Sequence, residues 1–155
     1  MESNRIEGTI LLKNGEIIDP WNEEQKKADI LMEQGIIKKV EKDIPMENVE
    51  EVIDIEGQQI TPGFLDIHAH LREPGQEDAE TIESGSEAAL AGGFTKVCCM
   101  PNTEPPISSE ESIELIKEKA KRVDIDIYPI ATISKDRAGE ELTELKQQKE
   151  KINKQ

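Results

Sequence analysis

Both histidines of the chain lie in one short segment, FLDIHAHLREPG, at residues 64–75. His68 and His70 are separated by one residue, so on a β-strand their imidazoles point to the same side. Neutral imidazole is the commonest metal ligand in proteins, and two imidazoles can hold one divalent ion if other strands complete its shell. The alternative is two unrelated histidines at a strand end. Because the pair directly follows an apolar strand and Arg72 lies on the same face, the spacing favours a metal site.

Further polar side chains lie close to the histidines or just after the next apolar run. Arg72 offers a planar guanidinium that can pair with a carboxylate, and Asn102 offers an amide donor. Taken individually, the two are also consistent with a surface arginine and a turn-forming asparagine. Asp66, two residues before the first histidine, either supports a histidine or is a buried acid at the strand end. Glu73 and Glu77 are predicted to be solvated loop charges.

The residues after position 60 alternate between apolar runs and helical segments. Strands are predicted at 63–71, 94–100 and 125–133, and helices at 79–93, 108–123 and 138–154. Gly92 and Gly93 close the first helix, and Ser108 with Glu111 is predicted to form a capping box at the start of the second. This alternation is typical of a parallel α/β sheet, which carries its active site at the carboxyl ends of its strands.

The residues before position 61 have the pattern of short strands. A strand over GTILLKNG is predicted to end in a turn at Asn14–Gly15. A hairpin is predicted around Gln34–Gly35, and the same plan repeats around Glu56–Gly57. Apolar and charged residues alternate in these runs, as they do in half-buried antiparallel strands. The chain is therefore expected to hold a β-rich domain over residues 1–60 and an α/β domain over residues 61–155.

The charge of the chain limits its partners. Of its 155 residues, 34% are charged, and the formal net charge is -15. Such a surface repels the phosphates of nucleic acids and anionic membranes. No stretch approaches the roughly 20 apolar residues of a membrane span, and the N-terminus MESNRIEG lacks the apolar segment of a signal peptide, so a cytoplasmic protein is expected. Cys98 and Cys99 are adjacent in an apolar run and are predicted to be reduced, buried thiols.

Two segments of the chain resemble a known enzyme family. TPGFLDIHAHLREPGQE, at residues 61–77, is similar to the first barrel strand and the following loop of the cyclic amidohydrolases. ESGSEAALAGGFTKVCCMPNTEPP, at residues 83–106, resembles dihydroorotase of the long bacterial type more than hydantoinase, dihydropyrimidinase or allantoinase. The resemblance implies a metal-dependent hydrolase of TIM-barrel fold, with about three βα units in residues 61–155 and strands of a small β-sandwich domain in residues 1–60.

The resemblance also implies roles for the residues above. His68 and His70 would be metal ligands for one or two zinc ions, and Arg72 and Asn102 would bind the carboxylate of the substrate. The implied reaction is the reversible cyclisation of N-carbamoyl-aspartate to dihydroorotate in pyrimidine biosynthesis. The remaining metal ligands and the aspartate that moves the proton are implied on later strands, so the catalytic base is expected beyond residue 155.

The number of strands sets a further expectation. A closed barrel needs eight strands and about 250 residues, whereas this chain has three predicted barrel strands. The chain is therefore expected to be the N-terminal third of a dihydroorotase and to be inactive by itself. For the full-length form, the resemblance implies either a homodimer or a complex with a carbamoyltransferase. Two alternatives stay open: another cyclic amidohydrolase, such as a hydantoinase or allantoinase, and a non-catalytic remnant or scaffold subunit.

Overall fold

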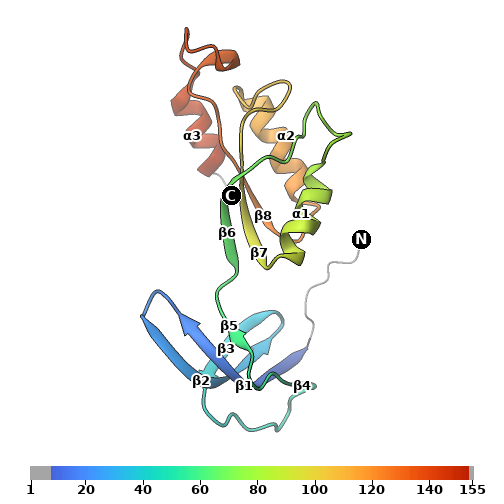
Figure 1. The fold of residues 1–155 in the computed structure, drawn as a ribbon, viewed down its shortest axis with the longest axis vertical. Coiled ribbons are helices and arrows are strands. Elements are labelled where there is room, and N and C mark those ends of the chain that lie inside the picture. Colours follow the sequence, from blue (N-terminus) through green and yellow to red (C-terminus); the bar gives the residue numbers. More distant parts are fainter. Residues whose placement is uncertain (1–7, 154–155) are drawn as a thin grey trace. The chain divides into compact units, whose positions relative to one another are not determined.

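Strands alone build the described chain before residue 63, whereas strands and helices alternate after it (Figure 1). The structure is a computed structural model that describes residues 8–153. The chain divides between Pro62 and Gly63 into two units. The α/β class predicted from the sequence is confirmed. Within residues 8–153, no helix is long and apolar enough to cross a membrane.

The first unit is a mixed five-stranded sheet with the order β3-β2-β1-β4, in which β5 also pairs with β1. Its strands are β1 (Thr9–Asp19), β2 (Glu24–Glu33), β3 (Ile36–Glu41), β4 (Glu51–Asp54) and β5 (Gln59–Ile60). The pairs β1–β2 and β2–β3 are antiparallel, whereas β4 and β5 run parallel to β1. The buried apolar side chains of this unit are Leu11, Ala28, Ile30 and Ile44.

The hairpin predicted around Gln34–Gly35 is confirmed. The two residues have φ values of 52° and 74°, and two positive φ angles are the mark of a type I′ turn. The hairpin predicted around Glu56–Gly57 is wrong, because β4 and β5 on either side of it both pair with β1 and not with each other. A turn pattern between two apolar runs does not specify which strand each run will pair with.

The turn predicted at Asn14–Gly15 is also wrong, because β1 continues through it. The register with β2 shifts between Leu12 and Gly15, so the chain forms a β-bulge there, and Asn14 has a φ of 63°. The buried Asp29 on β2 accepts the Asn14 N–H at 3.0 Å and the Lys13 ammonium at 2.8 Å. Asparagine tolerates left-handed backbone, so the same residue pair suits a bulge as well as a turn.

The second unit is built around a three-stranded parallel sheet in the order β6-β7-β8. Its elements are β6 (Phe64–Ala69), α1 (Ile82–Ala91), β7 (Phe94–Cys99), α2 (Glu110–Ala120), β8 (Asp126–Pro129), the short 3-10 helix η1 (Lys135–Arg137) and α3 (Leu145–Asn153). Helices α1 and α2 lie beside the strands, and α3 packs on α2 (Figure 1). The core between them consists of Leu71, Ile82, Val97, Cys99, Ile107, Ile113, Ile116, Ile125 and Ile127. The predicted alternation of strands and helices is confirmed.

The capping box of α2 lies one residue later than predicted. The Ser109 hydroxyl accepts the Ser112 N–H at 3.3 Å, and the Ser112 hydroxyl accepts the Ser109 N–H at 3.1 Å. The predicted pair of Ser108 and Glu111 is wrong, because Ser108 belongs to the preceding turn and donates its N–H to the carbonyl of Pro106. Two consecutive serines fit the cap pattern equally well, and the tertiary contacts of the preceding turn decide between them.

The third helix also begins later than predicted, since α3 spans Leu145–Asn153 and not 138–154. Gly139, inside the predicted range, has a φ of 77°, which an α-helix does not accommodate. The Thr143 hydroxyl donates to the Thr132 carbonyl at 2.8 Å, so residues 134–143 fold back as a loop. The predicted residue 154 lies outside the described chain.

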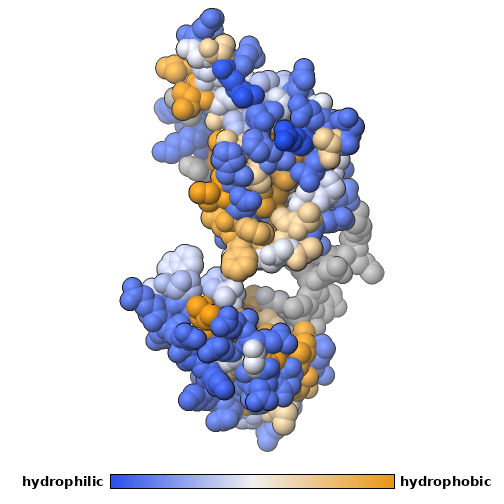
Figure 2. Space-filling view, viewed as in Figure 1, coloured by the Kyte–Doolittle hydropathy of each residue, from blue (hydrophilic) through white to orange (hydrophobic). Residues whose placement is uncertain are grey.

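Strand β6 forms one edge of the parallel sheet and exposes apolar side chains. Phe64, Leu65 and Ile67 are 52%, 49% and 70% exposed. Figure 2 shows apolar side chains, in orange, at the surface of the second unit. The outer edge of β6 has no partner strand in the described chain, and an edge with such side chains is a place where a further strand can pair and pack.

Candidate metal and substrate site

Two imidazole rings lie together at the carboxyl end of β6. His68 is on the strand and exposed, and His70 follows the last strand residue and is half-buried. The ring centroids are 5.3 Å apart with an edge-to-face angle of 65°. Ala69 between them packs against the helix-covered core. The fold thus brings the two candidate ligands to one point at the sheet end where α/β proteins carry their sites.

Asp66 holds the backbone of the first histidine. Its Oδ1 accepts the His68 N–H at 2.9 Å. The register with β7 shifts between Asp66 and Ala69, so β6 is irregular at the histidine itself. Asp66 is half-buried, and its hydrogen bond is to the peptide of His68 and not to the imidazole ring.

Asn102 reaches the second histidine from the loop after β7. Its Oδ1 lies 2.6 Å from Nδ1 of His70. With the amide oxygen as the acceptor, Nδ1 donates this hydrogen bond, and Nε2 is the ring nitrogen left to face a ligand. Metal-binding histidines are commonly oriented by such a partner on the other ring nitrogen. The amide oxygen of Asn102 is therefore engaged by His70, and its Nδ2 remains the donor that the side chain can offer to an anion.

Arg72 occupies an unusual backbone conformation two residues after His70. Its φ is 61°, and the Glu73 N–H donates across it to the Leu71 carbonyl at 2.7 Å, which makes a γ-turn. The Arg72 carbonyl accepts the Gln76 N–H at 3.0 Å. The side chain is on the loop at the carboxyl end of β6, half-buried, in the segment that carries the histidines.

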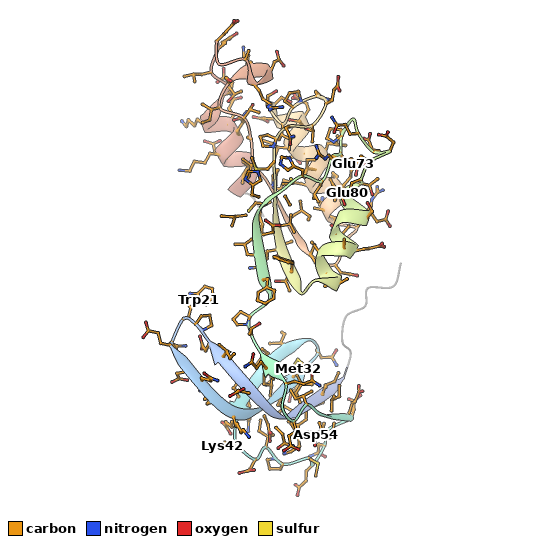
Figure 3. All side chains as sticks on the ribbon, viewed as in Figure 1. Trp21, Met32, Lys42, Asp54, Glu73 and Glu80 are labelled. Atoms are coloured by element: carbon orange, nitrogen blue, oxygen red, sulfur yellow. The ribbon has the colours of Figure 1, made fainter. Side chains whose placement is uncertain are left out.

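Glu73 is not the solvated loop charge that the sequence predicts. The residue is only 6% exposed, and it is labelled in Figure 3. Its carboxylate accepts the N–H of Ile82, the first residue of α1, at 2.8 Å and forms an ion pair with Lys119 on α2. The prediction holds for Glu77, which is exposed and accepts the Gly75 N–H, a hydrogen bond that lowers its pKa.

The donor set of this chain fits part of a metal site. Within residues 8–153, no group of three or more His, Cys, Asp or Glu side chains gathers around one point. Catalytic zinc usually has three protein ligands and structural zinc four, so His68 and His70 account for only two of them. Cys98 is half-buried and Cys99 is buried in the core, where burial raises the pKa of its thiol to about 11. Both cysteines are free thiols, as predicted, but the prediction that both are buried is wrong for Cys98.

The sequence comparisons with known proteins agree on one enzyme family. Residues 57–153 match the family model described as dihydro-orotase-like. A dihydroorotase of Sulfurihydrogenibium sp. is 53% identical over 137 residues, which cover 88% of this chain and 32% of the relative. A dihydroorotase of Caldanaerobacter subterraneus subsp. tengcongensis is 50% identical over 137 residues, with coverages of 88% and 31%. The chain spans about a third of the length of these curated relatives.

The fold of this chain is similar to part of a solved hydantoinase structure. The D-hydantoinase (dihydropyrimidinase) from Thermus sp. superposes with a TM-score of 0.63 at 32% sequence identity. The match covers 84% of this chain and 29% of that enzyme. This chain thus covers less than a third of the length of the two dihydroorotases and of the hydantoinase.

Proposed function

This chain belongs to the dihydroorotase-like family, and from this we propose that it supplies the first metal ligands and the substrate-carboxylate clamp of a dihydroorotase. The reaction is the reversible cyclisation of N-carbamoyl-aspartate to dihydroorotate in pyrimidine biosynthesis. The observation that carries the proposal is the convergence of His68 and His70, with Asn102 on Nδ1 of the second ring. Arg72 follows in the same loop.

Each of these residues has a separate task in the reaction. His68 and His70 would hold a divalent ion, which we propose to be zinc. The complete site would contain one or two such ions. When bound, the ion would polarise the ring carbonyl and acidify water. Asn102 holds His70 in the tautomer whose Nε2 is a ligand and offers Nδ2 to the substrate carboxylate. Arg72 pairs with that carboxylate, because the guanidinium fork matches its two oxygens. No residue of this chain is proposed as the base.

We propose that the whole enzyme is a TIM barrel with a small β-domain. The parallel strands β6, β7 and β8 with their intervening helices would be the first three units of a TIM barrel. The unpaired, apolar edge of β6 supports this, since it is where a neighbouring barrel strand would pair. The strands before residue 63 would be part of a small β-sandwich. We further propose that the whole enzyme is cytoplasmic and that it forms either a homodimer or a complex with a carbamoyltransferase.

A second candidate is a cyclic amidohydrolase of the hydantoinase type. The likeness to the Thermus hydantoinase structure fits this candidate but does not favour it over the first. The site residues of this chain do not separate the two candidate functions, since hydrolysis of either substrate needs a metal and polar contacts. Substrate preference separates them directly.

The test uses a chimera in which this chain replaces the segment that it matches in the Sulfurihydrogenibium dihydroorotase. The chimera is expected to open dihydroorotate and to lose more than about 1,000-fold in kcat/KM when His68 and His70 are both replaced by alanine. Glu118→Gln is the control, because it removes only an exposed ion pair with Lys121. A folded chimera that opens hydantoin but not dihydroorotate would favour the second candidate. Dihydroorotate turnover that survives the double replacement would refute the metal role.

A further inference from the structure

The backbone of Arg72 is strained, and it needs support from its neighbours. Non-glycine residues at positive φ are uncommon, and a γ-turn of this hand is rare because it costs energy. Strain of this kind persists where surrounding structure over-determines the conformation, and it is concentrated at functional sites. The φ of 61° and the hydrogen bond from the Glu73 N–H to the Leu71 carbonyl at 2.7 Å are therefore a reason to ask what holds the turn.

The residues on both sides of Arg72 are anchored in the core. Leu71 is 4% exposed, and its side chain fills the space beside Gly85 of α1. Glu73 is 6% exposed, and its carboxylate bridges two helices through the Ile82 N–H and the Lys119 ammonium. Because both carboxylate oxygens of Glu73 are held, the backbone of this residue has little freedom to rotate.

The ion pair with Lys119 also keeps the Glu73 carboxylate away from the Arg72 guanidinium. Glu73 is the immediate neighbour of Arg72, and an unpartnered Glu73 carboxylate would compete for the guanidinium. Lys119 occupies that carboxylate, and within residues 8–153 Arg72 makes no ion pair. The guanidinium of Arg72 is thus left for an anion that comes from outside the chain.

We propose that Glu73, paired with Lys119, is a positioning residue that acts through Arg72 on the binding of the substrate carboxylate. This inference rests on the proposed function, in which Arg72 is the carboxylate clamp. Glu73 does not touch the substrate. It fixes the turn that aims the Arg72 side chain, and it keeps its own charge on the helix side of the loop.

The test is a double-mutant cycle in the same chimera, with dihydroorotate as the substrate. Glu73→Gln keeps an acceptor for the Ile82 N–H but removes the charge, so KM is expected to rise about tenfold while kcat stays within about twofold. In an Arg72→Ala background the same replacement is expected to change KM by less than about twofold, because a positioning residue has no effect once its target is gone.

A second pair of variants covers the case in which Glu73→Gln does not fold. Lys119→Met removes the partner of Glu73 and is expected to raise KM, whereas Lys119→Arg keeps the ion pair and restores KM. Glu118→Gln, on the same helix, is expected to leave KM unchanged.

The outcomes separate the inference from the proposed function. A rise in KM from Glu73→Gln that is equally large in the Arg72→Ala background, or a fall in kcat alone, would overturn the positioning role. An unchanged KM in both Lys119 variants would overturn it as well. If Arg72→Ala itself leaves KM unchanged, or if the folded chimera does not act on dihydroorotate, the proposed function has failed, and the inference fails with it.

Discussion

Gly75 lies where the loop after β6 touches the loop after β7, and replacing it with alanine tests this contact directly. Its φ is 101°, and a Cβ placed on it would lie 2.1 Å from the carbonyl oxygen of Glu104 and 2.7 Å from the Glu104 Cβ. Glu104 cannot simply shift away, because its N–H donates to the Pro74 carbonyl at 2.9 Å. The added methyl group must therefore separate the two loops.

The expected cost is the sum of three physical effects. Positive φ costs an alanine about 1–2 kcal/mol, displacement of packed atoms about 1–3 kcal/mol and loss of the Pro74–Glu104 hydrogen bond about 1 kcal/mol. Gly75→Ala is therefore expected to destabilise the second unit by about 3–6 kcal/mol. Gly139→Ala is the matched control, because Gly139 also has positive φ, at 77°, but its Cβ would meet nothing within 4 Å. The control is expected to cost only about 1–2 kcal/mol.

The assay is amide hydrogen exchange of β7 in the 155-residue chain, which reports the free energy of opening of the second unit. Fluorescence is unsuitable, since the single tryptophan, Trp21, is 83% exposed and lies in the first unit. Loss of β7 protection in Gly75→Ala with retention in Gly139→Ala agrees with the reasoning. Opening free energies of the two variants within about 0.5 kcal/mol of each other would refute it.

Three further predictions concern other parts of the chain. Iodoacetamide at pH 8 should label the half-buried Cys98 before Cys99, whose pKa of about 11 leaves about one thiolate in a thousand; equal labelling in tandem mass spectra would contradict this. Asp29→Ala should cost about 2–4 kcal/mol in chemical denaturation. Burial raises the pKa of Asp29, but hydrogen bonds, from Lys13 first, outweigh it and lower the pKa, so the stabilisation is present above about pH 4 and is lost on further acidification. Zinc binding by the 155-residue chain should be weaker than about 1 µM and vanish when His68 and His70 become alanine; nanomolar binding that survives in calorimetry would exclude the pair as ligands.

Local patterns were sufficient for much of this protein. The alternation of apolar runs and helical segments after residue 60 predicts the parallel sheet, because strand and helix periods are properties of neighbouring residues. The spacing of His68 and His70 predicts that their rings lie together for the same reason, and the rings are 5.3 Å apart. The hairpin at Gln34–Gly35 follows from turn chemistry within two residues.

The tertiary structure alone decided which distant groups pair. Glu73 reads as a loop charge, but Lys119 and the N-terminus of α1 arrive beside it because α1 and α2 pack on the sheet. Asn102 follows His70 by 32 residues and meets it because β6 and β7 are adjacent. In the first unit, β4 and β5 pair with β1 and not with each other. Such contacts depend on where whole elements pack, and periodicity along the chain carries no information about that.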